Sequence, residues 1–81
     1  MKGDTTMNKT VTAKAMLTYL KDDWKIAHHE LEVLGHDDER AQSRVDWCIG
    51  MKEMCEALLC VPVNLKLDGR LTIGYEPEVE I

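Results

Sequence analysis

Histidine and carboxylate side chains, which are metal ligands in many proteins, gather between His28 and Asp38. His28 and Glu32 are four residues apart, so on a helix both side chains would lie on the same face. A structural zinc site usually needs a second pair of ligands at matched spacing, and the chain has no HExxH motif. We therefore expect no metal site and interpret these residues as a solvated helix end.

The three cysteines predict packing rather than chemistry. Cys48 and Cys55 are seven residues apart, the spacing of small core residues along one helical stripe, and Cys60 follows them. The sequence has no CxxC motif, and no histidine lies within a helical turn of any cysteine. An odd number of cysteines without a recognisable export signal argues against a disulfide framework, so we expect free thiols.

An ExxE pair, Glu53 and Glu56, is similar to the acidic pairs that bind magnesium in all-α nucleotide pyrophosphatases. Those enzymes need a second acidic pair on a facing helix, whereas this chain offers only the adjacent Asp22 and Asp23. P-loop, GxGxxG and GxSxG motifs are also absent. We expect no catalytic residue and no cofactor, with Glu53 and Glu56 on an outer face.

Tryptophan and methionine side chains are the strongest candidates for a binding surface, because both types are frequent in protein interfaces. The candidates are Trp24, Trp47, Met51 and Met54. The alternative is that they form the core, which is the stronger interpretation for Trp24. Nearby acids would complement a basic partner surface, and we include Asp22, Asp23, Glu53 and Glu56 among the partner-binding candidates.

The composition narrows the class of protein. The chain has 81 residues with 10 Lys+Arg, 15 Asp+Glu and a net charge of -5, so one small domain without a basic surface is expected. These charges argue against non-specific nucleic-acid binding. No apolar run is long enough to span a bilayer and no secretory signal is recognisable. We expect a cytoplasmic protein.

Two helices must position these side chains. From Thr12 to Leu34, apolar residues recur at alternating spacings of three and four, which predicts a helix ending at Gly35. A turn, His36–Asp38, offers an aspartate cap for a second helix that runs to about Leu59 or Cys60. The short turn makes the helices antiparallel and predicts Trp24 near Trp47 and Cys48.

A β-hairpin is predicted after the helices. We expect the loop Leu67-Asp68-Gly69, with Gly69 in the left-handed conformation, to pair Leu65 with Leu71, Val63 with Ile73 and Val61 with Tyr75. Pro62 places the first strand at a sheet edge. The tip then carries Lys66, Asp68, Gly69 and Arg70. The apolar side of the hairpin is expected on a stripe of the second helix formed by Met51, Met54 and Leu58.

The ends of the chain are expected to lie outside the domain. Residues 1–9 are predicted to be disordered, residues 10–76 to form a single α-α-β-β domain of the α+β class, and residues 77–81 to form an acidic tail. The codons for Lys2-Gly3-Asp4 could form a purine-rich ribosome-binding site, so either Met1 or Met7 is the natural start. A domain this small buries little apolar surface alone, which favours a homodimer.

The stretch from Gly50 to Leu59, leading into Leu67–Gly74, resembles short accessory proteins encoded by phages and prophages of low-GC bacteria. The resemblance implies a non-enzymatic role, either blocking a host protein, as anti-CRISPR and other anti-defence inhibitors do, or sequestering a small signal molecule. We therefore expect a small acidic binding protein that acts on a host or phage protein. The alternatives are a nucleotide-sequestering protein with a Trp/Met pocket at a subunit interface and a winged-helix-like regulator.

Overall fold

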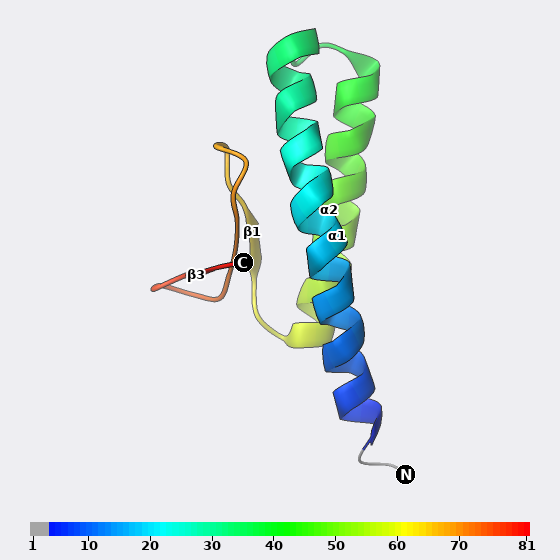
Figure 1. Cartoon of the computed structure of the whole chain (residues 1–81), viewed down its shortest axis with the longest axis vertical. Coiled ribbons are helices and arrows are strands. Elements are labelled where there is room, and N and C mark those ends of the chain that lie inside the picture. The colour runs from blue at the N-terminus through cyan, green and yellow to red at the C-terminus, as the bar shows by residue number, and fades with distance from the viewer. Residues whose placement is uncertain (1–3) are drawn as a thin grey trace.

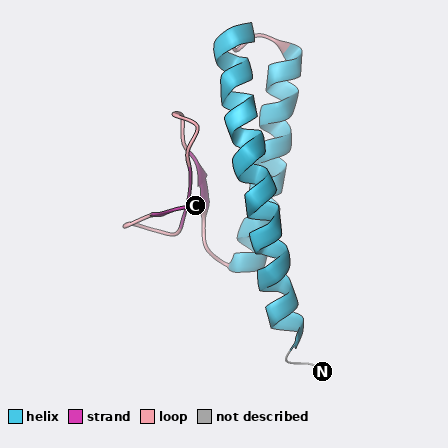
Figure 2. Ribbon diagram, viewed as in Figure 1, coloured by secondary structure: helices cyan, strands magenta, loops and turns pink. Residues whose placement is uncertain are grey.

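Two antiparallel helices make up most of the molecule (Figures 1 and 2). The computed structural model describes residues 4–81, with side chains from residue 11 onward. Helix α1 spans Asp4–Leu34 and α2 spans Glu39–Leu59; three short strands follow, β1 (Val63–Leu65), β2 (Leu71–Ile73) and β3 (Val79–Glu80). The strands form one antiparallel sheet in the order β1-β2-β3. The predicted α+β class, a helical hairpin followed by a β-hairpin, is confirmed, and β3 is an addition to it.

Helix α1 is longer than the sequence pattern predicts. It begins at Asp4 rather than near Thr12, so residues 4–9, which were expected to be disordered, have helical backbone. No proline or glycine interrupts the chain between Asp4 and Leu34, so nothing in the backbone chemistry stops the helix there. Residues 1–3, on which part of the disorder prediction and the question of the start codon fall, lie outside the described residues.

The turn between the helices follows the predicted chemistry. Gly35 has a φ of 92°, the left-handed conformation that ends a helix, and its N–H donates to the carbonyl of Leu31 at 3.0 Å. Asp38 caps α2, because its Oδ1 accepts a hydrogen bond from the N–H of Ala41 at 3.0 Å. The two helices therefore run side by side with a tight connection.

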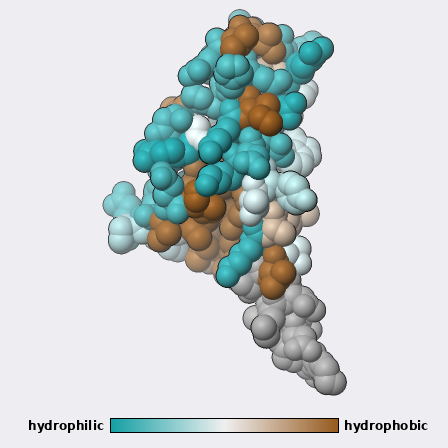
Figure 3. All heavy atoms as spheres, in the orientation of Figure 1, coloured by the Kyte–Doolittle hydropathy of each residue, from teal (hydrophilic) through white to brown (hydrophobic). Residues whose placement is uncertain are grey.

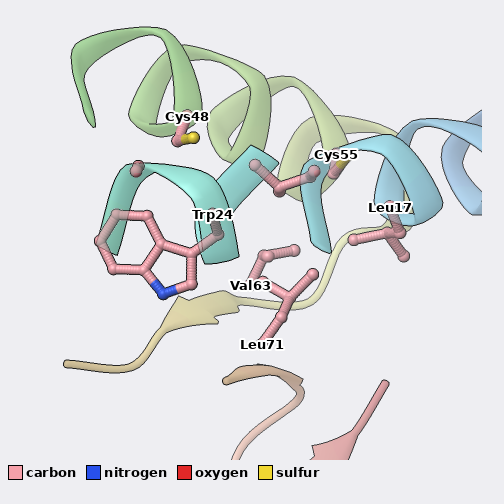
Figure 4. Close-up of a cluster of buried hydrophobic side chains, with 8 residues drawn as sticks. Leu17, Trp24, Cys48, Cys55, Val63 and Leu71 are labelled. Carbon is pink, nitrogen blue, oxygen red and sulfur yellow. The ribbon is translucent and has the colours of Figure 1, made fainter. Parts of the chain in front are cut away.

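The core lies where both helices meet the hairpin (Figure 4). Buried side chains of α1 recur at the predicted seam positions, and small residues of α2 face them. The cluster consists of Leu17, Leu20, Trp24, Ala27, Cys48, Cys55, Val63 and Leu71. The alternating spacing of three and four thus identified the buried side of α1 correctly.

The β-hairpin has the predicted bulged register. Val63 pairs with Ile73 and Leu65 pairs with Leu71, whereas the third predicted pair, Val61 with Tyr75, lies beyond the ends of β1 and β2. At the loop, the N–H of Lys66 donates to the carbonyl of Arg70 at 2.9 Å, and Gly69 adopts a φ of 88°. This positive φ is accessible to glycine at little cost, which is why the turn tolerates three residues.

Pro62 precedes β1, which is an edge strand as predicted. The carbonyl of Pro62 accepts a hydrogen bond from the N–H of Gly74 at 2.9 Å, but proline has no N–H to return. The side-chain amide of Asn64 donates to the carbonyl of Gly74 at 3.3 Å instead. The proline is therefore accommodated at the start of the edge strand.

The predicted position of the hairpin on α2 is wrong. It was expected on the stripe of Met51, Met54 and Leu58, whereas Val63 and Leu71 pack with core residues of both helices and Met54 stays exposed. Figure 1 shows the sheet on one side of the helical pair. The reason lies at the end of α2, where the side chain of Glu56 binds the backbone of Val63 and brings β1 to its own side of the helix.

The C-terminal residues are not a separate tail, contrary to the prediction for residues 77–81. Strand β3 pairs Thr72 with Glu80 and Ile73 with Val79. The N–H of Ile81 donates to the carbonyl of Leu71 at 2.9 Å, and the Ile81 side chain packs partly against the core. The alternation Glu-Val-Glu-Ile has the period of a strand, and the high number of acids concealed it.

Candidate interaction surface

Trp24 is a structural residue. Only 5% of it is exposed, and its indole Nε1 donates to the carbonyl of Lys66 at 2.8 Å. Figure 4 shows the ring extending from α1 toward the strands. Cys48 belongs to the same buried cluster, as predicted, but Trp47 is 48% exposed and does not. The four candidate side chains therefore do not form one cluster around Trp24.

Glu56 also has a structural role. One carboxylate oxygen accepts the backbone N–H of Val63 at 2.9 Å and lies 3.1 Å from Nζ of Lys52. The N–H of Val63 and then Lys52 lower the pKa of this carboxyl, against the opposing effect of burial. Its ExxE partner, Glu53, is exposed. The two glutamates thus have different roles, and the prediction of a shared outer face is wrong for Glu56.

The charges at the hairpin tip neutralise one another. Lys66 Nζ lies 2.6 Å from a carboxylate oxygen of Glu78, and Arg70 pairs with Asp68 at 2.6 Å and with Glu80 at 3.7 Å. Gly69 is buried, and a Cβ placed on it would lie 3.6 Å from the ring of His28. The tip therefore rests beside α1, with its cations engaged by acids, and two of these acids come from the C-terminal segment.

The sheet covers one side of the helical pair, and the contacts of Trp24 and Glu56 identify that side on each helix. Since each helical residue advances by about 100° around the axis, Tyr19 and Ile26 lie on the opposite side of α1 from Trp24. By the same geometry, Trp47 and Met54 lie on the opposite side of α2 from Glu56. We call this side the reverse face, and define it by Tyr19, Ile26, Trp47, Met51 and Met54.

An ion pair between Glu30 and Arg44 links the two helices and sets their alignment. One helical turn further along the antiparallel pair, Ile26 of α1 comes opposite Trp47 of α2. Two more turns bring Tyr19 opposite Met54. The apolar side chains of the reverse face therefore form two facing rows rather than scattered points.

Large apolar side chains of the reverse face remain accessible to solvent. Tyr19 is 69% exposed, Ile26 46%, Trp47 48% and Met54 59%, whereas Met51 is partly buried against the core. Within residues 4–81, no helix or strand covers this side of the pair (Figure 1). An apolar area of this kind on a small protein is typical of an interaction site.

Two acids of α1, Asp22 and Asp23, lie near these apolar residues, whereas the acids Asp46 and Glu53 of α2 lie on the flank nearer to Glu56. Asp22, Asp46 and Glu53 are exposed, and Asp23 is half-buried. None of the four makes an ion pair with a side chain in residues 11–81. The nearby cation Arg44 is engaged by Glu30. Five of the eight predicted partner-binding residues thus lie on or beside the reverse face: Asp22, Asp23, Trp47, Met51 and Met54. Trp24 and Glu56 contact the sheet, and the helical period places Glu53 about 60° from Glu56, away from the reverse face.

Tyr19 and Ile26 belong to this surface but were not among the predicted residues. They are seven residues apart, with Val33 a further seven along, and all three are exposed. This heptad spacing away from the buried seam was visible in the sequence. The stronger seam pattern accounts for the helix by itself, so this second pattern does not stand out.

Two of the three thiols are buried in the core, and His28 lies beside Glu32 of its own helix. Burial, followed by the charge of Asp23, raises the pKa of Cys48 to about 11, and burial also raises that of Cys55. All three cysteines are free, as predicted. Nε2 of His28 lies 3.6 Å from a carboxylate oxygen of Glu32. Among the residues that the structure describes, no three metal-ligating side chains are grouped to hold an ion.

A hollow of about 310 Å³ lies between the hairpin tip and the C-terminal half of α1. Its lining combines apolar and polar side chains: Trp24, His28, Leu31, Glu32, His36 and Leu67. Leu67 is 90% exposed, so the hollow is open on the side of the hairpin tip. Trp24 also lines a second hollow, of about 460 Å³, between β1 and α2.

Comparison of the chain with protein-family models, curated proteins and solved structures finds no match. Within the described residues, neither helix combines the length and apolar character needed to cross a bilayer. The functional assignment therefore rests on the geometry of the reverse face.

Proposed function

We propose that this chain is a small acidic, non-catalytic protein that acts by binding another protein through its reverse face. The observation that carries the proposal is the pair of apolar rows, Ile26 with Trp47 and Tyr19 with Met54, which stay exposed while Leu17, Leu20 and Trp24 are buried. Trp and Met are enriched at binding surfaces because they bury much area and adapt their packing.

The contacts of the other candidate residues argue against two alternative functions. A winged-helix regulator needs free cations on its wing to contact phosphate, whereas Lys66 and Arg70 are paired with acids. An acid-base role for the ExxE pair needs both carboxylates in one site, whereas Glu56 is bound to the backbone of Val63.

The resemblance to phage accessory proteins supports one kind of partner. We propose that the bound protein is a host protein, such as a component of a defence system, which the chain blocks inside the bacterial cell. A second copy of the chain is the other candidate occupant of the reverse face. The oligomeric state of the pure protein distinguishes the two occupants, because a homodimer would form without any other protein and would dissociate on dilution.

The test is affinity capture from a lysate of the source bacterium with three baits. These are the wild-type chain, the double variant W47A/M54A on the reverse face, and the control L67A/Y75A, which removes two exposed apolar side chains elsewhere. We expect a protein retained by the wild type and the control but reduced at least about tenfold with W47A/M54A. Equal retention by all three baits, or no retention above background, would contradict the proposal.

A small-ligand role has one observation in its favour, the hollow beside Trp24. A nucleotide base held there would raise the melting temperature by mass action. A thermal-shift screen with nucleotides separates the two proposals, because the protein-binding proposal expects no shift. A shift that persists in W47A/M54A and is lost when His28 is replaced by alanine would favour the ligand.

A further inference from the structure

We infer that the free edge of β1 binds an extended segment of a partner protein, which adds to the sheet as a fourth strand and lies along the outer flank of α2. On the side that faces the helix, the segment carries an apolar side chain between two basic ones. This site is separate from the reverse face. It is carried by three features of the structure: the open strand edge, the hollow beside it and the unpaired acids of α2.

The backbone of β1 has one paired side and one open side. Strand β2 lies on one side, and on the other no strand lies within the part of the chain that the structure describes. In an antiparallel pair, residues alternate between bonding to the partner strand and pointing away from it. The N–H of Lys66 donates to the carbonyl of Arg70, so Lys66 and, two residues earlier, Asn64 face β2. Val63 and Leu65 therefore direct their N–H and C=O groups to the open side.

One end of this open edge is occupied and the other is free. The side chain of Glu56 accepts the N–H of Val63 at 2.9 Å, in place of the carbonyl that a neighbouring strand would offer. Among the side chains of residues 11–81, no other one bonds to the backbone of Val63 or Leu65. Leu65 thus keeps a donor and an acceptor for a fourth strand. Folded proteins usually cover or blunt such an edge, and an open one is what strand addition uses.

The hollow of about 460 Å³ between β1 and α2 lies beside this edge. Leu65 belongs to its lining from the strand, and Val45 and Ile49 supply apolar surface from the helix. Ile49 is 39% exposed, so it is accessible from the hollow. Every second side chain of a strand that pairs with Leu65 would point toward the helix, and one of them would cover Ile49.

The cations that line this hollow are already paired. Lys52 lies 3.1 Å from a carboxylate oxygen of Glu56, and Lys66 lies 2.6 Å from one of Glu78. An acidic partner segment would have to break one of these ion pairs to reach a cation. A basic segment leaves both pairs intact, so the lining of the hollow favours it over an acidic one.

Two unpaired acids of α2 stand beside the hollow. Asp46 and Glu53 lie about 60° and about 40° around the helix from Ile49, on the side turned away from the buried Cys48, and both are exposed. Neither makes an ion pair within residues 11–81. Along the helix axis they lie about 4.5 Å before and about 6 Å after Ile49. Alternate side chains of a strand are about 7 Å apart, so a basic, an apolar and a basic residue match the three positions in turn.

A second copy of the chain fits this edge less well. Pairing of β1 with β1 of another copy requires a two-fold axis, which would bring the same flank of both α2 helices together. Asp46 and Glu53 of one copy would then face the same acids of the other, and like charges disfavour such an interface. A basic segment of a different protein meets opposite charges at the same place.

Two peptides of about nine residues test the inference. Both have a central valine and threonines elsewhere, except two positions before and two positions after the valine, which are lysine in one peptide and glutamate in the other. Binding is measured by fluorescence anisotropy of the labelled peptide. We expect the lysine peptide to bind at least about tenfold more tightly, with an affinity that falls as salt is added. Equal binding of the two peptides, or binding of neither, overturns the inference.

Backbone pairing is tested by N-methylation of single amides in the lysine peptide. Methylation removes a donor, so it should weaken binding by about fivefold or more where the N–H faces β1, and by less than about twofold at the residues between. Hydrogen exchange of the Leu65 amide is a second readout. This amide should exchange rapidly in the free protein and at least about tenfold more slowly with the peptide bound. Methylation effects without alternation, or a Leu65 amide protected in the free protein, contradict strand addition.

Matched variants locate the charges. D46N/E53Q removes the two unpaired acids and should weaken binding of the lysine peptide by about fivefold or more. The control D37N/E76Q removes two exposed acids elsewhere and should leave binding within about twofold. Circular dichroism checks that each variant is folded. An equal effect of the two double variants would show that only the net charge of the protein matters, and the inference would fail.

A last pair of variants separates this site from the reverse face. Ile49→Lys places a cation at the hollow and should weaken binding of the lysine peptide by about tenfold or more, whereas W47A/M54A should leave it within about twofold. Capture from lysate should show the opposite dependence. Peptide binding that survives Ile49→Lys, or a dimer of the pure protein that Ile49→Lys dissociates, overturns the inference. In either case the proposed function stands if capture still depends on Trp47 and Met54.

Discussion

The two sides of the helical pair use similar residues in opposite ways. On the side that the sheet covers, Trp24 donates to the backbone of Lys66 and Glu56 accepts from the backbone of Val63. Away from these contacts, Trp47 of the reverse face is half exposed, and the exposed Glu53 has no ion-pair partner among the described side chains. Of the two tryptophans, and of the two glutamates of the ExxE pair, only one of each bonds to the sheet.

This difference shows that polar side chains need hydrogen-bond partners where they are buried. Among the described residues that are not exposed, no buried side-chain nitrogen or oxygen lacks a hydrogen-bond partner. Leaving such a group unpaired in a core would cost about 1–3 kcal/mol, which is a large part of the stability of a small domain. Side chains of the reverse face keep their contact with water, so they are available to a partner.

Replacement of the two tryptophans by alanine gives the largest expected contrast. Trp24→Ala should lower the free energy of unfolding by about 3–5 kcal/mol, because it leaves a cavity and removes the bond to Lys66. Trp47→Ala should lower it by less than about 1 kcal/mol. Urea denaturation followed by circular dichroism measures both. Equal losses would show that Trp47 is part of the core.

Alanine substitutions at two glycines should change the stability of the protein in opposite directions. Gly69 has a φ of 88°, so Gly69→Ala should destabilise the protein by about 1–2 kcal/mol. Gly50 lies in α2 with open space around it, so Gly50→Ala should stabilise the protein by about 0.5–1 kcal/mol. Melting temperatures of the two variants relative to the wild type are the measurement. A loss of stability for Gly50→Ala would mean that the exposed side of α2 is more crowded than described.

The paired acids of the sheet side should make stability depend on pH. Hydrogen bonding to Val63 lowers the pKa of Glu56, and bonding to Lys66 and Thr72 lowers that of Glu78, both below the ordinary 4.5. A carboxyl with a lowered pKa in the folded state stabilises the protein above its unfolded pKa, and this stability is lost as pH falls through the folded pKa. We expect the free energy of unfolding to decrease below pH 4.5.

Glu56→Gln tests the origin of this pH dependence. The variant should lose about 1 kcal/mol near neutral pH, because Glu56 is partly exposed to water and the solvent screens its interactions. It should also show a shallower decrease in acid. Urea titrations at a series of pH values measure both effects, and an unchanged slope would exclude Glu56 as a source.

The smallest expected effect is chemical rather than energetic. At about pH 8, Ellman's reagent should modify Cys60 rapidly and leave Cys48 and Cys55 unmodified until the protein unfolds, because only the thiolate reacts and burial disfavours it. Cys60→Ser should abolish the rapid phase. Rapid reaction of a second thiol would indicate that the core opens easily between the helices.

Much of the fold was predictable because it depends on contacts that are local in the sequence. The seam of α1, the Asp38 cap, the Gly35 terminus and the bulged loop at Gly69 each follow from side-chain period or from the φ preference of glycine. The candidate surface was partly predictable as well. Trp47 and Met54 were recognised as interface types, whereas Tyr19 and Ile26 were overlooked beside the stronger seam pattern.

Long-range contacts were not predictable in the same way. β3 depends on pairing with β2, and its short alternating pattern competes with the acidic composition of the segment. The sheet has its place because Glu56 binds Val63, which directs β1 to one of two apolar sides of α2. Both sides carry apolar residues, so periodicity alone could not choose between them.

The sequence by itself determined which residues turn, which pair across the hairpin and which side of α1 is buried, because backbone conformation and side-chain period act over a few residues. The tertiary structure alone decided which tryptophan and which glutamate are structural. That choice depends on which side of the helical pair the sheet covers, since burial forces Trp24 and Glu56 to find partners and exposure leaves Trp47 and Glu53 without that constraint.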